Sequence, residues 1–243
     1  MNTDETGALD LVSSLVKTLS DITTVDIAVC PPFVYLQSVA EALSSSNISL
    51  GAQNLYFESS GAFTGEISCQ MLKDVCCTYV IIGHSERRHV MGETDELINK
   101  KINAAISGGL LPIFCVGELL EQRQAGQTQE VVSGQIEKGL SGIGTEKIEA
   151  VTIAYEPVWA IGTGKTASAK QAQEVHEMIR GLIGQMYDET IAKTIRIQYG
   201  GSAKPANTAE LMRCADVDGL LVGGASLKPN DFAAMVRTVA EMK

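Results

Sequence analysis

The sequence contains no uninterrupted apolar run long enough to cross a membrane, a span that needs about 20 residues. Its first seven residues, Met1 to Gly7, are polar and acidic and lack the apolar segment of a secretory signal peptide. We therefore expect no membrane-spanning helix and a protein that stays in the cytoplasm.

Positive charge is also scarce. The 243 residues include 19 Lys and Arg against 29 Asp and Glu, which gives a formal net charge of −10. A surface of this sign repels phosphate polymers and anionic lipids on average, so we predict no nucleic-acid partner and no membrane partner.

A C-x-x-C pair is absent as well, although the chain has six cysteines: Cys30, Cys69, Cys76, Cys77, Cys115 and Cys214. Their neighbours are mostly apolar. We expect free, buried thiols in a reducing compartment and neither disulfides nor a metal site.

No segment rich in proline, glycine and serine divides the chain, so residues 1–243 are predicted to form one domain. Short apolar segments alternate with segments of helical periodicity. This alternation favours an α/β fold with a parallel sheet, either a closed barrel or an open doubly wound sheet. The seven predicted strands are Asp26–Cys30, Ile48–Ala52, Tyr79–Ile82, Leu110–Val116, Ile148–Tyr155, Ile195–Tyr199 and Gly219–Val222.

Polar residues and glycines follow four of these strands at their carboxyl ends, where α/β folds place their active sites. The four groups, in chain order, are His84, Glu156, Gly200-Gly201-Ser202 and Gly223-Gly224. The carboxyl ends of parallel strands meet on one face, so we expect an imidazole, a carboxylate and two glycine-rich turns to form one site.

Glu156 is the candidate general base. Pro157 favours an extended conformation at Glu156, so the carboxylate leaves the strand in a defined direction. The next residues mix apolar side chains with glycines and can fold over a site. Burial beneath such a lid raises the proton affinity of a carboxylate toward that of a useful base. The alternative is a structural ion-pair partner.

His84 is predicted to act as a neutral hydrogen-bond donor. Ser85 and Glu86 suit the first turn of a helix, and the partial positive charge of a helix amino terminus disfavours a protonated imidazole. A purely structural histidine is the alternative. His89 and His176 have no comparable neighbours, and we expect them on the surface or on a helix face.

Gly162, Ser202, Gly223 and Gly224 are candidate ligands of a phosphate monoester. Backbone amides at glycine turns and helix starts bind anions without a charged side chain. The loops after the last two strands are also the usual phosphate position in α/β barrels.

Two nucleotide-binding patterns near the lid are rejected. Gly164-Lys165-Thr166 matches the end of a P-loop, but the first glycine of that motif would fall on Trp159. Residues 162–167 match a relaxed dinucleotide fingerprint, yet residues 156–161 separate them from their strand.

Motifs along the whole chain resemble those of the triosephosphate isomerase family. They are Ala52-Gln53-Asn54, Gly61-Ala62-Phe63-Thr64-Gly65-Glu66, Gly83-His84-Ser85-Glu86-Arg87-Arg88, Cys115-Val116-Gly117-Glu118, residues 154–165, Tyr199-Gly200-Gly201-Ser202 and residues 222–227. The resemblance implies a (β/α)8-type barrel that interconverts dihydroxyacetone phosphate and glyceraldehyde 3-phosphate through an enediolate, without a metal or cofactor. This family is a standard example of a carboxylate base that works with a neutral histidine.

The resemblance also implies roles for individual residues. Glu156 would move the carbon-bound proton, His84 would polarise the carbonyl, and Glu86 would support the site. The phosphate would bind to Gly162, Ser202, Gly223 and Gly224. The lid would comprise Pro157, Val158, Trp159, Ala160, Ile161, Gly162, Thr163, Gly164, Lys165 and Thr166. A homodimer would form through the loop from Gln53 to Glu66, with Thr64 near its tip.

The start of the sequence departs from the family pattern. Family members open with a strand that brings an asparagine and a lysine into the site, whereas this sequence begins with Met1-Asn2 as if directly after that lysine. We expect a truncated start with seven of eight strands present. The alternative is a crippled, phosphate-binding barrel. Either way, the two flanking strands are expected to keep unpaired edges.

Overall fold

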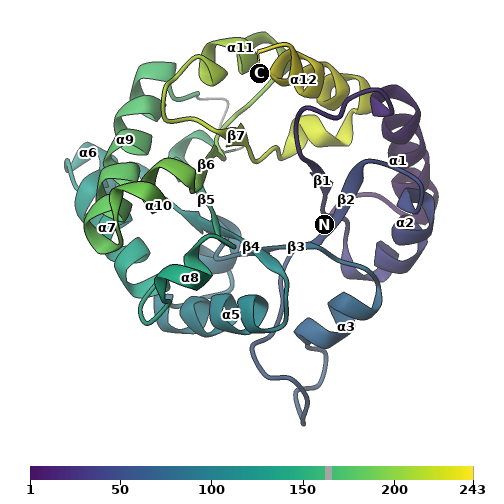
Figure 1. The fold of residues 1–243 in the computed structure, drawn as a ribbon, viewed down its shortest axis with the longest axis horizontal. Coiled ribbons are helices and arrows are strands. Elements are labelled where there is room, and N and C mark those ends of the chain that lie inside the picture. The colour runs from purple at the N-terminus through teal and green to yellow at the C-terminus, as the bar shows by residue number, and fades with distance from the viewer. Residues whose placement is uncertain (162–165, 243) are drawn as a thin grey trace.

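The computed structural model describes residues 1–161 and 166–242. In these residues the seven predicted parallel strands are present, and they lie side by side in chain order. In Figure 1 they surround the centre of the molecule, and the helices form an outer ring. The strands are β1 (Ile27–Val29), β2 (Ile48–Ala52), β3 (Tyr79–Ile82), β4 (Leu111–Val116), β5 (Thr152–Tyr155), β6 (Arg196–Tyr199) and β7 (Gly219–Leu220).

Helices connect each strand to the next. The α-helices are α1 (Glu5–Leu19), α2 (Leu36–Leu43), α3 (Cys69–Asp74), α4 (Ser85–His89), α5 (Asp95–Ser107), α6 (Leu120–Gln124), α7 (Thr128–Gly139), α8 (Thr145–Ile148), α9 (Ala169–Met186), α10 (Glu189–Thr194), α11 (Pro205–Met212) and α12 (Pro229–Glu241). The 3₁₀ helices of the described residues are η1 (Phe33–Tyr35), η2 (Val158–Ala160) and η3 (Gly224–Leu227). Within the described residues, none of the helices is long and apolar enough to cross a membrane.

The predicted strand boundaries agree with the structure at β2 and β3 but not everywhere. The predicted strand Ile148–Tyr155 begins only at Thr152, because α8 ends at Ile148. Ile148 is buried in this helix. A short apolar run does not distinguish a buried helical turn from a strand, which explains the difference. The last strand is shorter than predicted and ends at Leu220.

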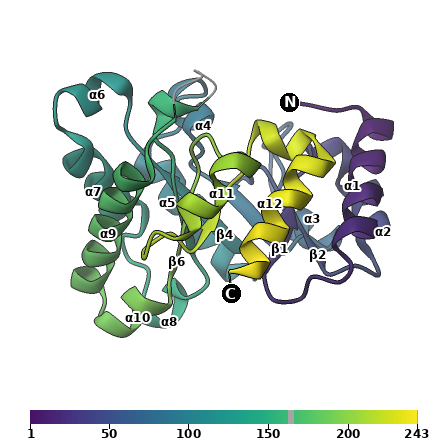
Figure 2. The same ribbon diagram turned by 90° about the horizontal axis from the view of Figure 1, so that it is seen from above.

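The two edge strands, β1 and β7, are joined through their helices. Within the described residues β1 pairs only with β2, and β7 only with β6, so the predicted unpaired edges are confirmed. On the outside, α12 packs against α1 (Figures 1 and 2). Arg237 of α12 donates hydrogen bonds to Asp21 and to the carbonyl of Thr18. The helical layer is therefore continuous across β1 and β7.

The sheet buries apolar residues on both faces. Val80, Ile82 and Phe114 belong to the large core between the strands and the helices. Ile113, Cys115 and Ala154 form a second, inner cluster. Successive side chains of a strand point to opposite faces, so β3, β4 and β5 contribute to both cores. This double packing holds the strand ends that carry the site.

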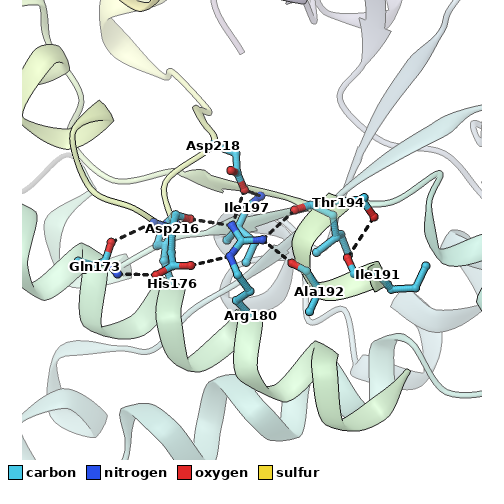
Figure 3. Close-up of polar contacts among 10 residues, drawn as sticks. Gln173, His176, Arg180, Ile191, Ala192, Thr194, Ile197, Asp216 and Asp218 are labelled. Atoms are coloured by element: carbon cyan, nitrogen blue, oxygen red, sulfur yellow. Dashed lines mark hydrogen bonds and ion pairs between the residues drawn. The ribbon is translucent and has the colours of Figure 1, made fainter. Parts of the chain in front are cut away.

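A network of polar contacts around Arg180 of α9 ties α9 and α10 to the amino ends of β6 and β7 (Figure 3). Its guanidinium pairs with Asp216 and Asp218, with both N···O distances 2.6 Å. It also donates to the carbonyls of Ala192 and Ile195 and to the carbonyl of Asp216. All five of its N–H groups are thereby used, which satisfies a buried charge that would otherwise be costly.

His176 of α9 belongs to the same network and is fully buried, so the expected helix position is correct but the expected surface position is wrong. Its Nδ1 lies 3.0 Å from the carbonyl oxygen of Asp216, which only accepts hydrogen bonds, so Nδ1 carries the proton. Its ring packs near Tyr155 and Tyr199. Nε2 is buried without a partner among the described residues. Burial lowers the pKa of His176 to about 4, against the opposing effect of the Asp216 carbonyl.

This low pKa predicts an acid-dependent loss of stability. An unfolded histidine has a pKa of about 6.5. As the pH falls from about 6.5 toward 4, the unfolded chain binds a proton at residue 176 that the folded chain does not, so the free energy of unfolding decreases by up to about 3 kcal/mol. Denaturant titrations of the wild type and of His176→Asn between pH 7 and pH 4 measure the difference.

The exposed His89 offers the control, His89→Asn, which should keep the acid dependence attributed to residue 176. A stability difference between wild type and His176→Asn that stays constant over this pH range would contradict the assignment.

Candidate active site

Glu156 and His84 contact each other at the carboxyl ends of β5 and β3. The Glu156 Oε1 lies 2.9 Å from the His84 Nε2, and the Glu156 Oε2 accepts a 2.8 Å hydrogen bond from the backbone amide of Ser85. Only 2% of Glu156 is exposed. The structure therefore brings together the two candidate catalytic residues that the sequence predicted.

Neighbouring strand ends fix the position of Glu156. Its amide donates a 2.7 Å hydrogen bond to the carbonyl of Val116 at the end of β4. A side chain at Gly117 would place its Cβ only 1.7 Å from the Glu156 carbonyl oxygen, and one at Gly200 would come within 2.9 Å of the Glu156 Cγ. Glycine is thus required at 117, and it leaves room for the Glu156 side chain at 200.

His84 caps the amino terminus of α4. Its Nδ1 accepts a 3.3 Å hydrogen bond from the backbone amide of Glu86, so the proton of the neutral ring lies on Nε2, which faces Glu156. The preceding residue, Gly83, has a φ of +73°, a left-handed conformation that favours glycine. This turn directs the imidazole toward Glu156, as a donor.

The pKa of His84 differs from the expectation of a disfavoured protonated form. Burial lowers this pKa, but the hydrogen bond to Glu156, the charge of that carboxylate and the charge of Glu86 together raise it above its usual value. The sequence argument considered only the helix terminus and not the contact with Glu156. Glu86 itself is exposed, and its Oε2 lies 3.8 Å from the His84 Nδ1.

Glu118, just beyond β4, is a buried carboxylate that the sequence analysis did not select as a site residue. It is fully buried and accepts hydrogen bonds from the hydroxyl of Tyr155 at 3.1 Å and from the indole Nε1 of Trp159 at 3.0 Å. Arg123 and Thr128 lie 3.4 Å away. The sequence signals were its position, directly after a buried strand, and its place in the motif Cys115-Val116-Gly117-Glu118. It connects the start of the predicted lid to the end of β5.

The structure describes part of the predicted lid. Pro157 follows Glu156, residues Val158, Trp159 and Ala160 form η2, and Ile161 ends the first described part. The Val158 amide donates a 3.2 Å hydrogen bond to the carbonyl of Glu118. Thr166 is exposed, and the second described part begins with it. The predicted lid residues Gly162, Thr163, Gly164 and Lys165 lie outside the described residues.

Three of the four candidate phosphate-binding residues are described, and they follow adjacent strands. Ser202 comes after β6, while Gly223 and Gly224 come after β7 and lead into η3. Within the described parts of the chain, no hydrogen bond uses the backbone amides of these three residues. Added Cβ atoms at Gly223 and Gly224 would meet open space. These amides are free to bind an anion. Gly162, the fourth candidate, is not described.

The described residues hold no cluster of three or more His, Cys, Asp or Glu side chains that could bind a metal ion. The contact between Glu156 and His84 can support proton transfer between a buried carboxylate and a ligand, assisted by a neighbouring imidazole. Free backbone amides at the next two strand ends could hold an anionic group of that ligand.

Comparison with known proteins gives a consistent result. The profile of the family Triosephosphate isomerase matches residues 1–239. The triosephosphate isomerase of Carboxydothermus hydrogenoformans is 58% identical over 230 residues, which are 95% of this chain and 92% of that protein. Those of Moorella thermoacetica and Rhodopirellula baltica are 56% and 52% identical, over 97% and 96% of this chain and 93% and 91% of those proteins.

Proposed function

This chain belongs to the triosephosphate isomerase family, and we propose that Glu156 and His84 carry out the reaction for which the family is named. The chain interconverts dihydroxyacetone phosphate and D-glyceraldehyde 3-phosphate. The similarity extends over nearly the whole chain and favours this activity over a non-catalytic phosphate-binding barrel.

The 2.9 Å contact between the Glu156 carboxylate and the His84 Nε2 is the observation that supports the catalytic roles. In the reaction, the Glu156 carboxylate removes a proton from C1 of dihydroxyacetone phosphate. The electron pair of that C–H bond forms the C1–C2 double bond of the enediolate, and the negative charge moves to the carbonyl oxygen.

His84 stabilises this oxygen through Nε2–H. We propose that the substrate carbonyl oxygen replaces Glu156 as the acceptor of this hydrogen bond, so the two residues act on the same substrate from neighbouring positions. His84 then transfers protons between the two oxygens, while Glu156 returns its proton to C2. Both groups end the cycle in their starting protonation states.

The free amides of Ser202, Gly223 and Gly224 support phosphate binding, and Gly162 completes the proposed set from the lid. Backbone amides are fixed dipoles, unlike the flexible charged side chains of lysine and arginine, so they hold the phosphate in one orientation. This arrangement anchors the end of the substrate that does not react.

Closure of the lid would exclude water from the enediolate and limit loss of the phosphate. Glu118 would fix the base of the lid during this movement, because it accepts hydrogen bonds from the Trp159 indole and the Tyr155 hydroxyl. Glu86 is assigned a supporting role, because it lies beside His84 and is exposed. The proposed reaction involves only proton transfers and requires no metal or cofactor.

The six cysteines are free thiols, which supports a reducing, cytoplasmic location.

A direct assay tests the proposed activity. The purified chain, supplied with dihydroxyacetone phosphate, should form glyceraldehyde 3-phosphate at a rate that inorganic phosphate inhibits competitively, because both ligands use the same amides. Saturable binding of dihydroxyacetone phosphate without turnover would favour the phosphate-binding barrel instead.

We also propose a homodimer formed through the loop from Gln53 to Glu66, which projects beyond the ring of helices in Figure 1. Phe63 in this loop is 39% exposed although its ring lies 4.8 Å from that of Tyr56, and Thr64 beside it is exposed. Val90 and Met91, after α4, are also exposed, at 73% and 65%. A second copy of the chain would cover these apolar side chains in an isologous interface.

Light scattering after gel filtration measures the oligomeric state. The wild type should elute as a dimer of twice 25.9 kDa, and Phe63→Glu should shift it toward the monomer because the new charge would be buried unpaired. Met242→Glu, a similarly exposed apolar position near the end of α12 and away from this loop in Figure 1, should remain dimeric. A wild-type monomer would refute the proposal.

A further inference from the structure

Arg88 of α4 is a buried cation beside the site that the proposed reaction does not use. Only 7% of its side chain is exposed. Its Nε donates a 2.8 Å hydrogen bond to the carbonyl of Gly83, and its Nη2 donates a 3.0 Å hydrogen bond to the carbonyl of Cys115. The Nη1 pairs with Asp95 at 2.6 Å. Within the described residues, Arg88 makes no hydrogen bond or ion pair with Glu156, Ser202, Gly223 or Gly224.

The two carbonyls that Arg88 binds lie where the β3–β4 ladder stops. The last registered pair is Ile82 with Phe114, and β4 continues to Val116. The carbonyl of Val116 faces β5, because it accepts from the Glu156 amide, so the carbonyl of Cys115 faces β3. Opposite Cys115, however, β3 has already ended, because the chain turns away at Gly83. The guanidinium occupies the position that the next strand residue would have filled.

Because the Arg88 guanidinium takes the place of a further strand residue, β3 can end early. The chain then turns at Gly83, which has a φ of +73°. The residue after that turn is His84. Gly83 therefore has its carbonyl held by Arg88, while the next residue presents its Nε2 to Glu156 at 2.9 Å. A shift of the Gly83 carbonyl would change the direction in which the imidazole leaves the backbone.

The guanidinium is itself held in one orientation. Asp95, the first residue of α5, binds its outer nitrogen, and the carbon of the guanidinium lies 5.9 Å from the centroid of the Phe114 ring. A planar group with several donors can bind two carbonyls and a carboxylate together, whereas a lysine ammonium is a single point charge. Lysine at this position would keep the charge but not the three fixed contacts.

We propose that Arg88 is a positioning residue for the isomerisation, which fixes the Gly83–His84 turn so that the Nε2–H of His84 is aimed at the substrate oxygen. The inference rests on the proposed role of His84 and adds a residue that acts through it.

Steady-state kinetics of Arg88→Lys tests this inference. Displacing a catalytic group by about 1 Å costs on the order of a hundredfold in rate, so we expect kcat to fall about 10- to 100-fold. The KM for dihydroxyacetone phosphate should change by less than about twofold, because the phosphate binds at other strand ends. In a His84→Gln background the same substitution should have almost no further effect, since the residue through which it acts is gone.

Arg180→Lys provides the matched control, because Arg180 is a partly buried arginine that also binds aspartate and carbonyl groups, but at the amino ends of the strands. It should lower the thermal midpoint with little change in kcat. Asp95→Asn is a second variant, which keeps Arg88 but removes its ion pair with Asp95. It should lower kcat several-fold when His84 is present and have almost no effect in the His84→Gln background.

The outcomes separate this inference from the proposed function. If His84→Gln lowers kcat but Arg88→Lys retains wild-type kcat, or if the two effects multiply in the double variant, Arg88 has only a structural role and the inference is wrong. If His84→Gln itself retains wild-type turnover, the role proposed for His84 fails first.

Discussion

Replacing Glu156 by glutamine should reduce kcat by about four orders of magnitude, because the amide cannot accept the carbon-bound proton. Glu156→Asp keeps the charge but withdraws the carboxylate by about one methylene, and it should reduce kcat by on the order of a hundredfold or more. KM should change much less in both variants. Steady-state assays in both reaction directions measure these effects.

Folding should tolerate both substitutions. Glutamine can still accept the hydrogen bond from the Ser85 amide, and it removes a charge that is 98% buried. Thermal unfolding of the variants separates lost catalysis from lost structure. Glu174→Gln, at an exposed position of α9, is the matched control and should retain wild-type activity. Near-normal turnover in folded Glu156→Gln would exclude Glu156 as the base.

The second large effect is expected for His84→Gln. Glutamine retains a side-chain N–H donor but cannot transfer protons between the two substrate oxygens, so kcat should decrease by about a hundred- to a thousandfold. His89→Gln changes an exposed histidine five residues further along the chain and should leave kcat unchanged. Equal activity of the two variants would contradict the role of His84.

The pH dependence of kcat/KM gives an independent test of the same residue. Burial lowers the pKa of His84, but the hydrogen bond to Glu156 and the charges of Glu156 and Glu86 together raise it above its usual value in the free enzyme. As the pH falls through this raised pKa, His84 gains a proton and forms an ion pair with the Glu156 carboxylate. The ion pair holds Glu156 away from the substrate, so kcat/KM decreases. In His84→Gln the decrease should move to lower pH. An unchanged acid limb would show that another group controls it.

The position of the site could be predicted because it depends only on the parallel direction of the strands. Parallel strands in sequence order bring their carboxyl ends to one face, and this placed His84 near Glu156 without knowledge of any side-chain contact. The free amides at Ser202 and Gly223 follow from the same rule. No comparable rule predicts the contacts that tune the site.

The contacts that were missed join residues far apart in the sequence. Glu118 accepts a hydrogen bond from Trp159, 41 residues away, and Arg88 binds the carbonyl of Cys115, 27 residues away. The raised pKa of His84 depends on Glu156, whereas local sequence showed only the helix start. His176 was misplaced because its helix buries a polar residue against two tyrosines, which hydrophobic periodicity does not indicate.

Deuterium incorporation tests the central claim most directly, namely that Glu156 carries a proton between the two carbons. When the purified chain converts dihydroxyacetone phosphate in D₂O, a proton held on a carboxyl group can exchange with solvent before it returns. We predict that part of the glyceraldehyde 3-phosphate carries deuterium at C2, and that Glu156→Gln forms such product at least about a thousandfold more slowly. Product that forms rapidly with no deuterium at C2 would indicate direct hydride transfer between the carbons and would contradict the account.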